Sequence, residues 1–240
     1  MRSSAKSVSV IIPTLNEATA LPYLLEDLQK ETEYIKEIII VDAMSTDDTV
    51  KKAKQYSKVT VITSEIRSPA HQRSLGGKKA TGEILVFMDA DVQLPIKGLE
   101  KLINKFIDKN LDIACPYYSP LSSNLIIKMI YAFFNLLFFV FQKLSPSGAG
   151  SCIIVKRELF EKLDGFNQKM TYDDIEFIRR ASRNGKFGML SEKVFVSTRR
   201  FEKYGILRTT VQYVLLSLFF VLGMFRLANI MKYEFAKYED

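Results

Sequence analysis

The chain has 240 residues, of which 48% are hydrophobic and 25% charged, a composition that excludes a disordered or collagen-like protein. Two cysteines are too few for a disulfide framework or a cysteine zinc site, and a single histidine excludes histidine-triad metal chemistry and most Ser-His-Asp or Cys-His hydrolases. The formal net charge of +7 comes wholly from residues 121–240, because residues 1–120 hold equal numbers of basic and acidic side chains.

The first half of the chain alternates between short β-branched runs and amphipathic stretches. We predict strands at 8–12, 38–42, 59–62 and 84–88, and helices at 18–30, 46–56, 68–79 and 97–109. Short strands that alternate with helices are typical of a parallel sheet with helices on both faces. Such sheets bind ligands at the carboxyl ends of their strands, where this sequence places residues 13–17, Asp42 and residues 89–91.

The second half is less regular and carries the two most apolar stretches. We predict an apolar helix at 125–141, a tight loop at 145–151, a strand at 152–155, helices at 157–163 and 171–184, and a long final helix at 206–232. Basic and apolar character together indicate contact with an anionic membrane surface, and long Phe and Leu runs fit a nucleic-acid surface poorly. The first residues, MRSSAKSVSVIIP, lack the pattern of a signal peptide, so we expect a cytoplasmic location.

Two carboxylates directly follow the predicted strand at 84–88. Alternate side chains of an extended segment project to the same side, so Asp89 and Asp91 can reach one point. Mg²⁺ and Mn²⁺ prefer oxygen ligands and can share them with a diphosphate. The pair therefore indicates a divalent cation site, although a turn or a helix cap would use the same residues.

Three further segments surround this Asp-x-Asp motif in the chain: residues 10–17 (VIIPTLNE), 40–49 (IVDAMSTDDT) and 73–83 (RSLGGKKATGE). Together the four segments resemble the nucleotide-sugar-binding half of the family 2 glycosyltransferases, which have the GT-A fold. Farther along, residues 150–166 and 172–176 (YDDIE) resemble the stretch around the family's catalytic acid pair, with Asp173 in place of Glu. Residues 197–205 (STRRFEKYG) resemble a signature of small, membrane-associated members.

The resemblance implies a role for each matching residue. On the donor side, Pro13, Thr14 and Glu17 would line the nucleotide pocket. Asp42 would hydrogen-bond the base, and Arg73 would neighbour the base and diphosphate. Asp89 would contact the ribose or the metal, and Asp91 would hold the metal. Asp174 would be the general base that accepts the proton of the acceptor hydroxyl. Arg199 and Arg200 would steady the leaving diphosphate or an acceptor phosphate.

Structural roles compete with several of these assignments. Asp42 could cap the helix at 46–56, and Asp47 and Asp48 are expected to cap it. Asp173 is expected to be structural or to set the pKa of its neighbour. Ala43 and Ser74 depart from the family pattern and leave the donor open.

The apolar segments decide the topology. A span at 125–141 would place the Asp-x-Asp motif and Asp174 on opposite sides of a membrane, so this segment is expected to be interfacial, packed on the protein, or re-entrant. The apolar run at 211–225 follows every motif, and we favour an interfacial helix there over a single C-terminal span. A buried helix or the pairing of two copies would also cover these segments, so a homo-oligomer stays open.

The sequence thus predicts one GT-A domain, 1–240, with a mixed and mostly parallel sheet, a nucleotide-sugar-binding half (1–120), an acceptor and catalytic half (121–205) and a membrane-associating helix (206–240). The expected activity is inverting transfer, dependent on Mg²⁺ or Mn²⁺, from a nucleotide-diphosphate sugar to a lipid-linked or glycolipid acceptor at the cytoplasmic membrane face. The alternatives are an inactive nucleotide-sugar-binding protein and a sugar nucleotidyltransferase; no nucleic-acid partner is expected.

Overall fold

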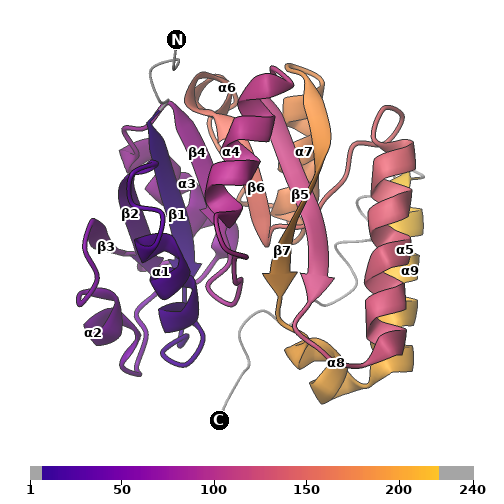
Figure 1. The fold of residues 1–240 in the computed structure, drawn as a ribbon, viewed down its shortest axis with the longest axis horizontal. Helices are drawn as coiled ribbons and strands as arrows, with labels where there is room; N and C mark the ends of the chain where they lie inside the picture. Colours follow the sequence, from indigo (N-terminus) through magenta and orange to yellow (C-terminus); the bar gives the residue numbers. More distant parts are fainter. Residues whose placement is uncertain (1–6, 222–240) are drawn as a thin grey trace.

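A computed structural model describes residues 7–221, which form a seven-stranded sheet surrounded by helices (Figure 1). The strands are β1 (Val8–Thr14), β2 (Ile35–Asp42), β3 (Val59–Thr63), β4 (Ile84–Met88), β5 (Ile113–Pro120), β6 (Cys152–Lys156) and β7 (Phe187–Val196). Their order across the sheet is β3-β2-β1-β4-β6-β5-β7. Strand β6 runs antiparallel to β4 and β5, and the other neighbouring pairs are parallel, so the predicted mixed, mostly parallel sheet is confirmed.

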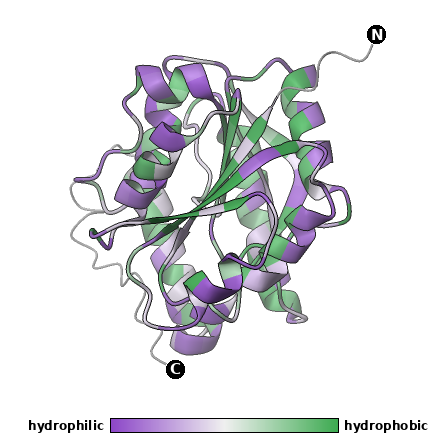
Figure 2. Cartoon of the chain, turned by 90° about the vertical axis from the view of Figure 1, so that its left-hand side faces the viewer, coloured by the Kyte–Doolittle hydropathy of each residue, from purple (hydrophilic) through white to green (hydrophobic). Residues whose placement is uncertain are grey.

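The helices cover both faces of this sheet. They are α1 (Leu21–Gln29), α2 (Thr49–Ala53), α3 (Pro69–Lys79), α4 (Gly98–Asp108), α5 (Leu125–Phe141), α6 (Arg157–Lys162), α7 (Asp173–Ser182), α8 (Arg199–Tyr204) and α9 (Ile206–Val221). In Figure 1, α1 and α4 lie in front of the sheet and α3, α6 and α7 lie behind it. Apolar residues predominate in the strands between them, as the green ribbons of Figure 2 show, and most of those in β1, β4 and β6 are buried in the core.

Three elements were not predicted from the sequence: β5, β7 and α8. Strand β5 contains Pro116 and Pro120, which are unfavourable inside strands, and its pairing with β7 shifts register between Cys115 and Tyr117. Strand β7 is interrupted by polar residues 191–193, which hide its period. Pairing with tertiary neighbours makes these segments strands despite their weak local signal.

Helices α5 and α9 stand side by side at one edge of the molecule (right in Figure 1). A ring contact between Phe134 and Tyr213, with centroids 6.2 Å apart, joins the two helices. Helix α5 is fixed to the sheet through Asn135, whose side-chain amide accepts from the Tyr118 N–H at 3.0 Å and donates to the Tyr118 carbonyl at 2.8 Å. These two hydrogen bonds hold the apolar helix α5 against β5 near its carboxyl end.

Within residues 7–221, none of the helices is both long and apolar enough to cross a membrane. Helix α5 has the predicted bounds, and α9 begins at Ile206 as predicted. The rest of the predicted final helix, 222–232, lies outside the described residues.

Candidate active site

The loops after β1 and β2 are tied together at the carboxyl edge of the sheet. The Asn16 N–H donates to Ser45 Oγ at 2.9 Å, and the Thr46 N–H donates to Asn16 Oδ1 at 2.9 Å. From α3, the buried Gln72 amide donates to the carbonyls of Thr14 and Val41. These bonds fix one wall of a cavity that Pro13, Thr14 and Gln72 line.

Asp42 lies behind this wall, with only 2% of its surface exposed. Its Oδ1 accepts from Thr14 Oγ1 at 3.0 Å and from Ser45 Oγ, and its Oδ2 accepts from the Ser45 N–H at 2.8 Å. The alternative role in capping falls to Asp47, whose Oδ1 accepts from the Thr49 N–H at the start of α2. Asp42 therefore organises the rim loops, and its contact with a base stays a prediction.

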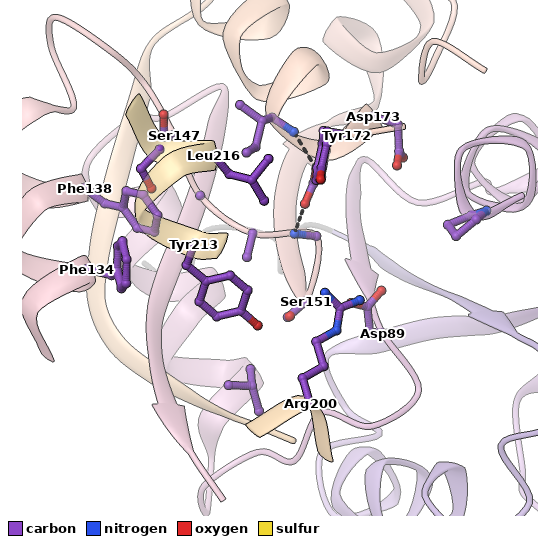
Figure 3. A pocket seen from close by; sticks show the side chains of 18 of the residues that line it. Asp89, Phe134, Phe138, Ser147, Ser151, Tyr172, Asp173, Arg200, Tyr213 and Leu216 are labelled. Atoms are coloured by element: carbon purple, nitrogen blue, oxygen red, sulfur yellow. Dashed lines mark hydrogen bonds between the residues drawn. The ribbon is translucent and has the colours of Figure 1, made fainter. Parts of the chain in front are cut away.

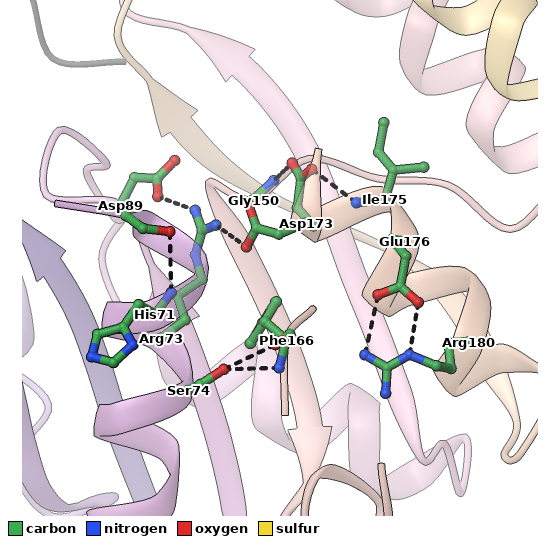
Figure 4. Close-up of polar contacts among 12 residues, drawn as sticks. His71, Arg73, Ser74, Asp89, Gly150, Phe166, Asp173, Ile175, Glu176 and Arg180 are labelled. Atoms are coloured by element: carbon green, nitrogen blue, oxygen red, sulfur yellow. Dashed lines mark hydrogen bonds and ion pairs between the residues drawn. The ribbon is translucent and has the colours of Figure 1, made fainter. Parts of the chain in front are cut away.

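Arg73 links the two halves of the predicted site (Figure 4). Its side chain, 5% exposed, donates from Nη2 to Asp89 Oδ1 at 2.7 Å and from Nη1 to Asp173 Oδ2 at 2.8 Å. Arg73 of α3 thus joins the Asp-x-Asp motif after β4 to the acidic start of α7. Arg73 and Asp173 are 100 positions apart in the sequence. Burial disfavours the guanidinium charge, but the carboxylates of Asp173 and Asp89 outweigh this effect and raise the pKa of Arg73.

Asp174 is held by backbone donors on both oxygens. The Gly150 N–H donates to Oδ2 at 2.7 Å and the Ile175 N–H donates to Oδ1 at 2.8 Å (Figure 4). A Cβ at position 150 would lie 2.6 Å from Arg73 Nη2 and 3.1 Å from Asp174 Oδ2, so only glycine lets the loop approach both groups. Asp174 also lines the cavity, and a carboxylate can accept more hydrogen bonds than these two.

A second cation, Arg199 at the start of α8, bridges two acids from distant parts of the chain. Its Nη2 lies 2.8 Å from Asp91 Oδ2 and 3.1 Å from Glu17 Oε1. Burial disfavours the Arg199 charge as well, and the hydrogen bond to Asp91 and the charge of Glu17 raise its pKa nonetheless. Five charged residues from four segments of the chain, Glu17, Arg73, Asp89, Asp91 and Arg199, thus meet at one edge of the sheet.

Burial also raises the pKa of three carboxyl groups of the site. It raises the pKa of Glu17 to about 7, against the opposing charge of Arg199. It raises the pKa of Asp173 to about 6 and that of Asp174 above its usual range, and in both cases the Arg73 charge opposes the increase. A carboxylate with a raised pKa is a stronger proton acceptor than a solvated one, which suits Asp174 to its predicted role.

The residues fit a divalent cation in one specific way. Asp89 and Asp91 offer carboxylate oxygens whose side chains are 34% and 27% exposed toward the cavity. Among the described residues, however, no cluster of three or more His, Cys, Asp or Glu side chains could hold an ion unaided. The donor set therefore fits a cation that takes its other ligands from a bound diphosphate.

The cavity has a volume of about 1140 Å³ and two chemically different halves (Figure 3). Acids and cations at the sheet edge line one half, together with Ser151 and Arg200. Aromatic and aliphatic side chains of α5 and α9 line the other, with Phe134, Phe138, Tyr213 and Leu216 pointing inward. Asp174 lines the same cavity, and its neighbour Asp173 is joined to Asp89 through Arg73.

The structure brings together all the predicted site residues except Asp42 around this cavity: Pro13, Thr14, Glu17, Arg73, Asp89, Asp91, Asp174, Arg199 and Arg200 line it. Gln72 and Gly150 were not predicted as site residues, although Gly150 was part of the motif at 150–166. The ring-lined half was also missed. Five phenylalanines in α5 were its sequence signal, but the sequence led us to expect membrane contact, packing on the protein or the pairing of two copies for this segment, and not a wall of the site.

Comparison with known proteins agrees with this geometry. Residues 9–164 match the family model described as glycosyl transferase family 2; the match ends before Asp174 and Arg199. A cholesterol galactosyltransferase of Borreliella burgdorferi is 30% identical over 192 residues, which cover 71% of this chain and 54% of that protein. A dolichol-phosphate mannosyltransferase of Pyrococcus furiosus is 38% identical over 112 residues, 45% of this chain and 32% of that protein.

A solved structure with a similar level of sequence identity shares the fold. The mannosyltransferase PcManGT of Pyrobaculum calidifontis, in complex with GDP-Man and Mn²⁺, superposes with a TM-score of 0.65 and 25% identity, covering 80% of this chain and 57% of that one. The chain spans just over half the length of the galactosyltransferase and of PcManGT, and about a third of the length of the dolichol-phosphate mannosyltransferase.

Proposed function

The chain belongs to glycosyltransferase family 2, and from this premise we propose that it transfers a sugar from a nucleotide-diphosphate sugar to a hydroxyl group of a membrane-associated lipid acceptor. One observation carries the proposal: a single cavity holds the Asp-x-Asp carboxylates, the buried acid Asp174 and an apolar wall. The donor, the base and the acceptor would thus share one chamber.

The polar half suits the donor. Pro13, Thr14 and Glu17 would line the nucleotide, and a divalent cation held by Asp91, with Asp89 beside it, would neutralise charge on the diphosphate. Arg199 and Arg200 would stabilise the same diphosphate as it leaves. The solved structure of PcManGT holds such a pair, GDP-Man and Mn²⁺.

The chemistry falls to Asp174. Its carboxylate would accept the proton of the acceptor hydroxyl while that oxygen forms a bond to the anomeric carbon of the sugar. The bond between the anomeric carbon and the diphosphate oxygen breaks in the same step, and the bonding electrons leave with the diphosphate. A single displacement of this kind inverts the configuration at the anomeric carbon.

The acceptor side faces a membrane in this proposal. Large apolar side chains are exposed on both edge helices, among them Leu125 (69%), Met129 (63%), Leu136 (58%) and Leu207 (79%). Basic side chains of the same region are exposed too: Lys128, Lys143, Lys203 and Arg208. Apolar and basic groups together suit the interface of an anionic leaflet, here the cytoplasmic face of the cell membrane. The names of two relatives record a sterol and a polyprenyl phosphate as acceptors.

A donor panel tests the proposal. The thermal unfolding midpoint of the full chain in detergent is measured with UDP-, GDP-, CMP- and dTDP-sugars, each with and without Mn²⁺. A metal-dependent increase with one nucleotide is expected, because a ligand that binds only the folded state stabilises it. Asp91→Asn should abolish that increase. A stable protein that responds to none of these donors would contradict the transferase and favour an inactive relative.

A further inference from the structure

We propose that the apolar half of the cavity, between α5 and α9, binds the hydrocarbon part of the acceptor and admits it sideways from a lipid layer. The ligand is a long or bulky apolar alcohol whose hydroxyl end reaches Asp174. This inference rests on the proposed function and names the class of its second substrate.

The two helices build a continuous apolar wall. The Phe134 ring contacts Phe138 at 6.3 Å within α5 and contacts Tyr213 of α9 edge-on at 6.2 Å. Leu216 of α9 is 6% exposed and points into the same space (Figure 3). Residues from both helices therefore form one surface, and a ligand between them would contact both.

No charge lies on this wall. Thirteen residues in the described parts of α5 and α9 line the cavity, and none is charged: Ile130, Tyr131, Phe133, Phe134, Asn135, Leu137, Phe138, Phe141, Tyr213, Val214, Leu216, Ser217 and Leu218. The Asn135 amide is already bonded to the backbone of Tyr118. A sugar or peptide acceptor would leave most of its polar groups unpaired here, which is costly, whereas a hydrocarbon would not.

The wall is continuous with the chemistry. One cavity is lined both by the rings of α5 and α9 and by Ser147, Gly150 and Asp174. Gly150 and Asp174 are hydrogen-bonded, so the end of the apolar half lies beside the predicted base. The volume of about 1140 Å³ exceeds the ~300–1,000 Å³ of an ordinary single-ligand pocket, which leaves room for two substrates.

The helices expose apolar side chains on their outer side as well. Leu136 and Leu215, 58% and 40% exposed, do not line the cavity, although their neighbours Leu137 and Leu216 do. An apolar layer that covers the outer side would therefore meet the inner wall along the line between the helices. An alcohol dissolved in that layer could enter without crossing water.

A matched pair of tryptophan substitutions on α9 tests the inference. Ser217→Trp would fill the space between the helices, and Leu215→Trp puts the same side chain on the outer face, two residues away. The full chain in detergent is irradiated with a diazirine-bearing farnesol, and labelled peptides are quantified by mass spectrometry. We expect labelling of cavity-lining residues of α5 and α9, a decrease of at least about tenfold in Ser217→Trp, and a change of less than about twofold in Leu215→Trp.

Labelling that Ser217→Trp leaves unchanged, or that falls on the outer residues alone, would overturn the inference. If Ser217→Trp does not fold, Leu137→Asp and its neighbour Leu136→Asp repeat the comparison with the same expected contrast. The donor panel is run on the same samples to separate the two proposals. Specific labelling without any donor response would support the alcohol site and refute the transferase. A donor response without specific labelling would support the transferase and refute the alcohol site.

Discussion

Arg199 and Asp91 are 108 positions apart in the sequence, and Nη2 of the arginine lies 2.8 Å from Oδ2 of the aspartate. The same nitrogen also reaches Glu17 Oε1 at 3.1 Å. A guanidinium thus neutralises the carboxylate that is predicted to hold the divalent cation. The cation and Arg199 would compete for Asp91, and Arg199 would be released toward the diphosphate when the metal binds.

Arg199→Gln should therefore increase the affinity of the nucleotide-free protein for Mn²⁺. Removing the Arg199 charge, which repels the metal at close range, corresponds to about 1 kcal/mol in water and more in a partly buried site. The affinity for Mn²⁺ is therefore expected to increase about tenfold. Electron paramagnetic resonance of free Mn²⁺ measures the affinity without any turnover. Lys203→Gln, an exposed charge on the same helix, is the control and should change it less than about twofold. An unchanged affinity in Arg199→Gln would show that the two cations do not compete.

Asp174→Asn should abolish transfer and leave donor binding intact. General base catalysis contributes about 10²- to 10⁴-fold to a rate, and kcat is expected to decrease by that factor. The donor-induced increase in unfolding midpoint should stay the same, because Asp174 accepts from the Gly150 and Ile175 N–H groups and is not one of the predicted donor-binding residues. Asp108→Asn, an exposed aspartate on α4, serves as the control. Retention of most of the activity in Asp174→Asn would remove it as the base.

Arg73→Gln should shift the pH dependence of kcat toward higher pH. Asp174 must lose its proton to act as the base, and the Arg73 charge opposes the effect of burial on the pKa of Asp174 and of its neighbour Asp173. Without that charge the acid pair would ionise at a higher pH, so the rising limb of the profile should move up, with apparent values that belong to the pair. Arg73→Lys keeps the charge and should stay closer to the wild type. A limb that does not move would argue against coupling between Arg73 and the acid pair.

Glu17→Gln should change how stability depends on pH. Burial raises the pKa of Glu17 from 4.5 to about 7 in the folded chain, so between these values the folded state holds a proton that the unfolded state has lost. Stability from this group therefore decreases as pH rises from about 4.5 to 7. Urea midpoints at pH 5.0 and 7.5 should differ less in Glu17→Gln than in the wild type, whereas Glu26→Gln, an exposed change on α1, should keep the wild-type difference. Equal differences in all three proteins would refute the shifted pKa.

Charges on the outer face of the edge helices should release the protein from membranes. Met129→Glu combined with Leu136→Glu places two anions where the proposal puts an anionic leaflet, and binding to phosphatidylglycerol vesicles should decrease by at least about tenfold. Co-sedimentation with the vesicles measures this. Ile96→Glu alters an apolar side chain that is 86% exposed in the turn before α4 and should have little effect. Unchanged vesicle binding with loss of self-association would instead assign this face to a second copy of the chain.

The first half of the fold could be read from the sequence because its signals are local. The run at 84–88 has the same bounds as β4, and Ser68 caps α3 by accepting from the His71 N–H. Strands β5 and β7 could not be read in this way. Pro116 and the polar residues 191–193 weaken their local preference, and pairing between the two segments supplies what the sequence lacks.

For the site, the sequence by itself determined which chemical groups are present: the pair Asp89 and Asp91 at the end of a predicted strand, the acid Asp174 in the first turn of a predicted helix, and the cations near 199. The tertiary structure alone decided which of them meet. Ion pairs between Arg73 and Asp173 or between Arg199 and Asp91 join residues about 100 positions apart, and no local pattern encodes such contacts. The two faces of α5 were also indistinguishable in the sequence, because both are apolar. Only the packing of α5 beside α9 turns one of them toward the cavity and leaves the other exposed.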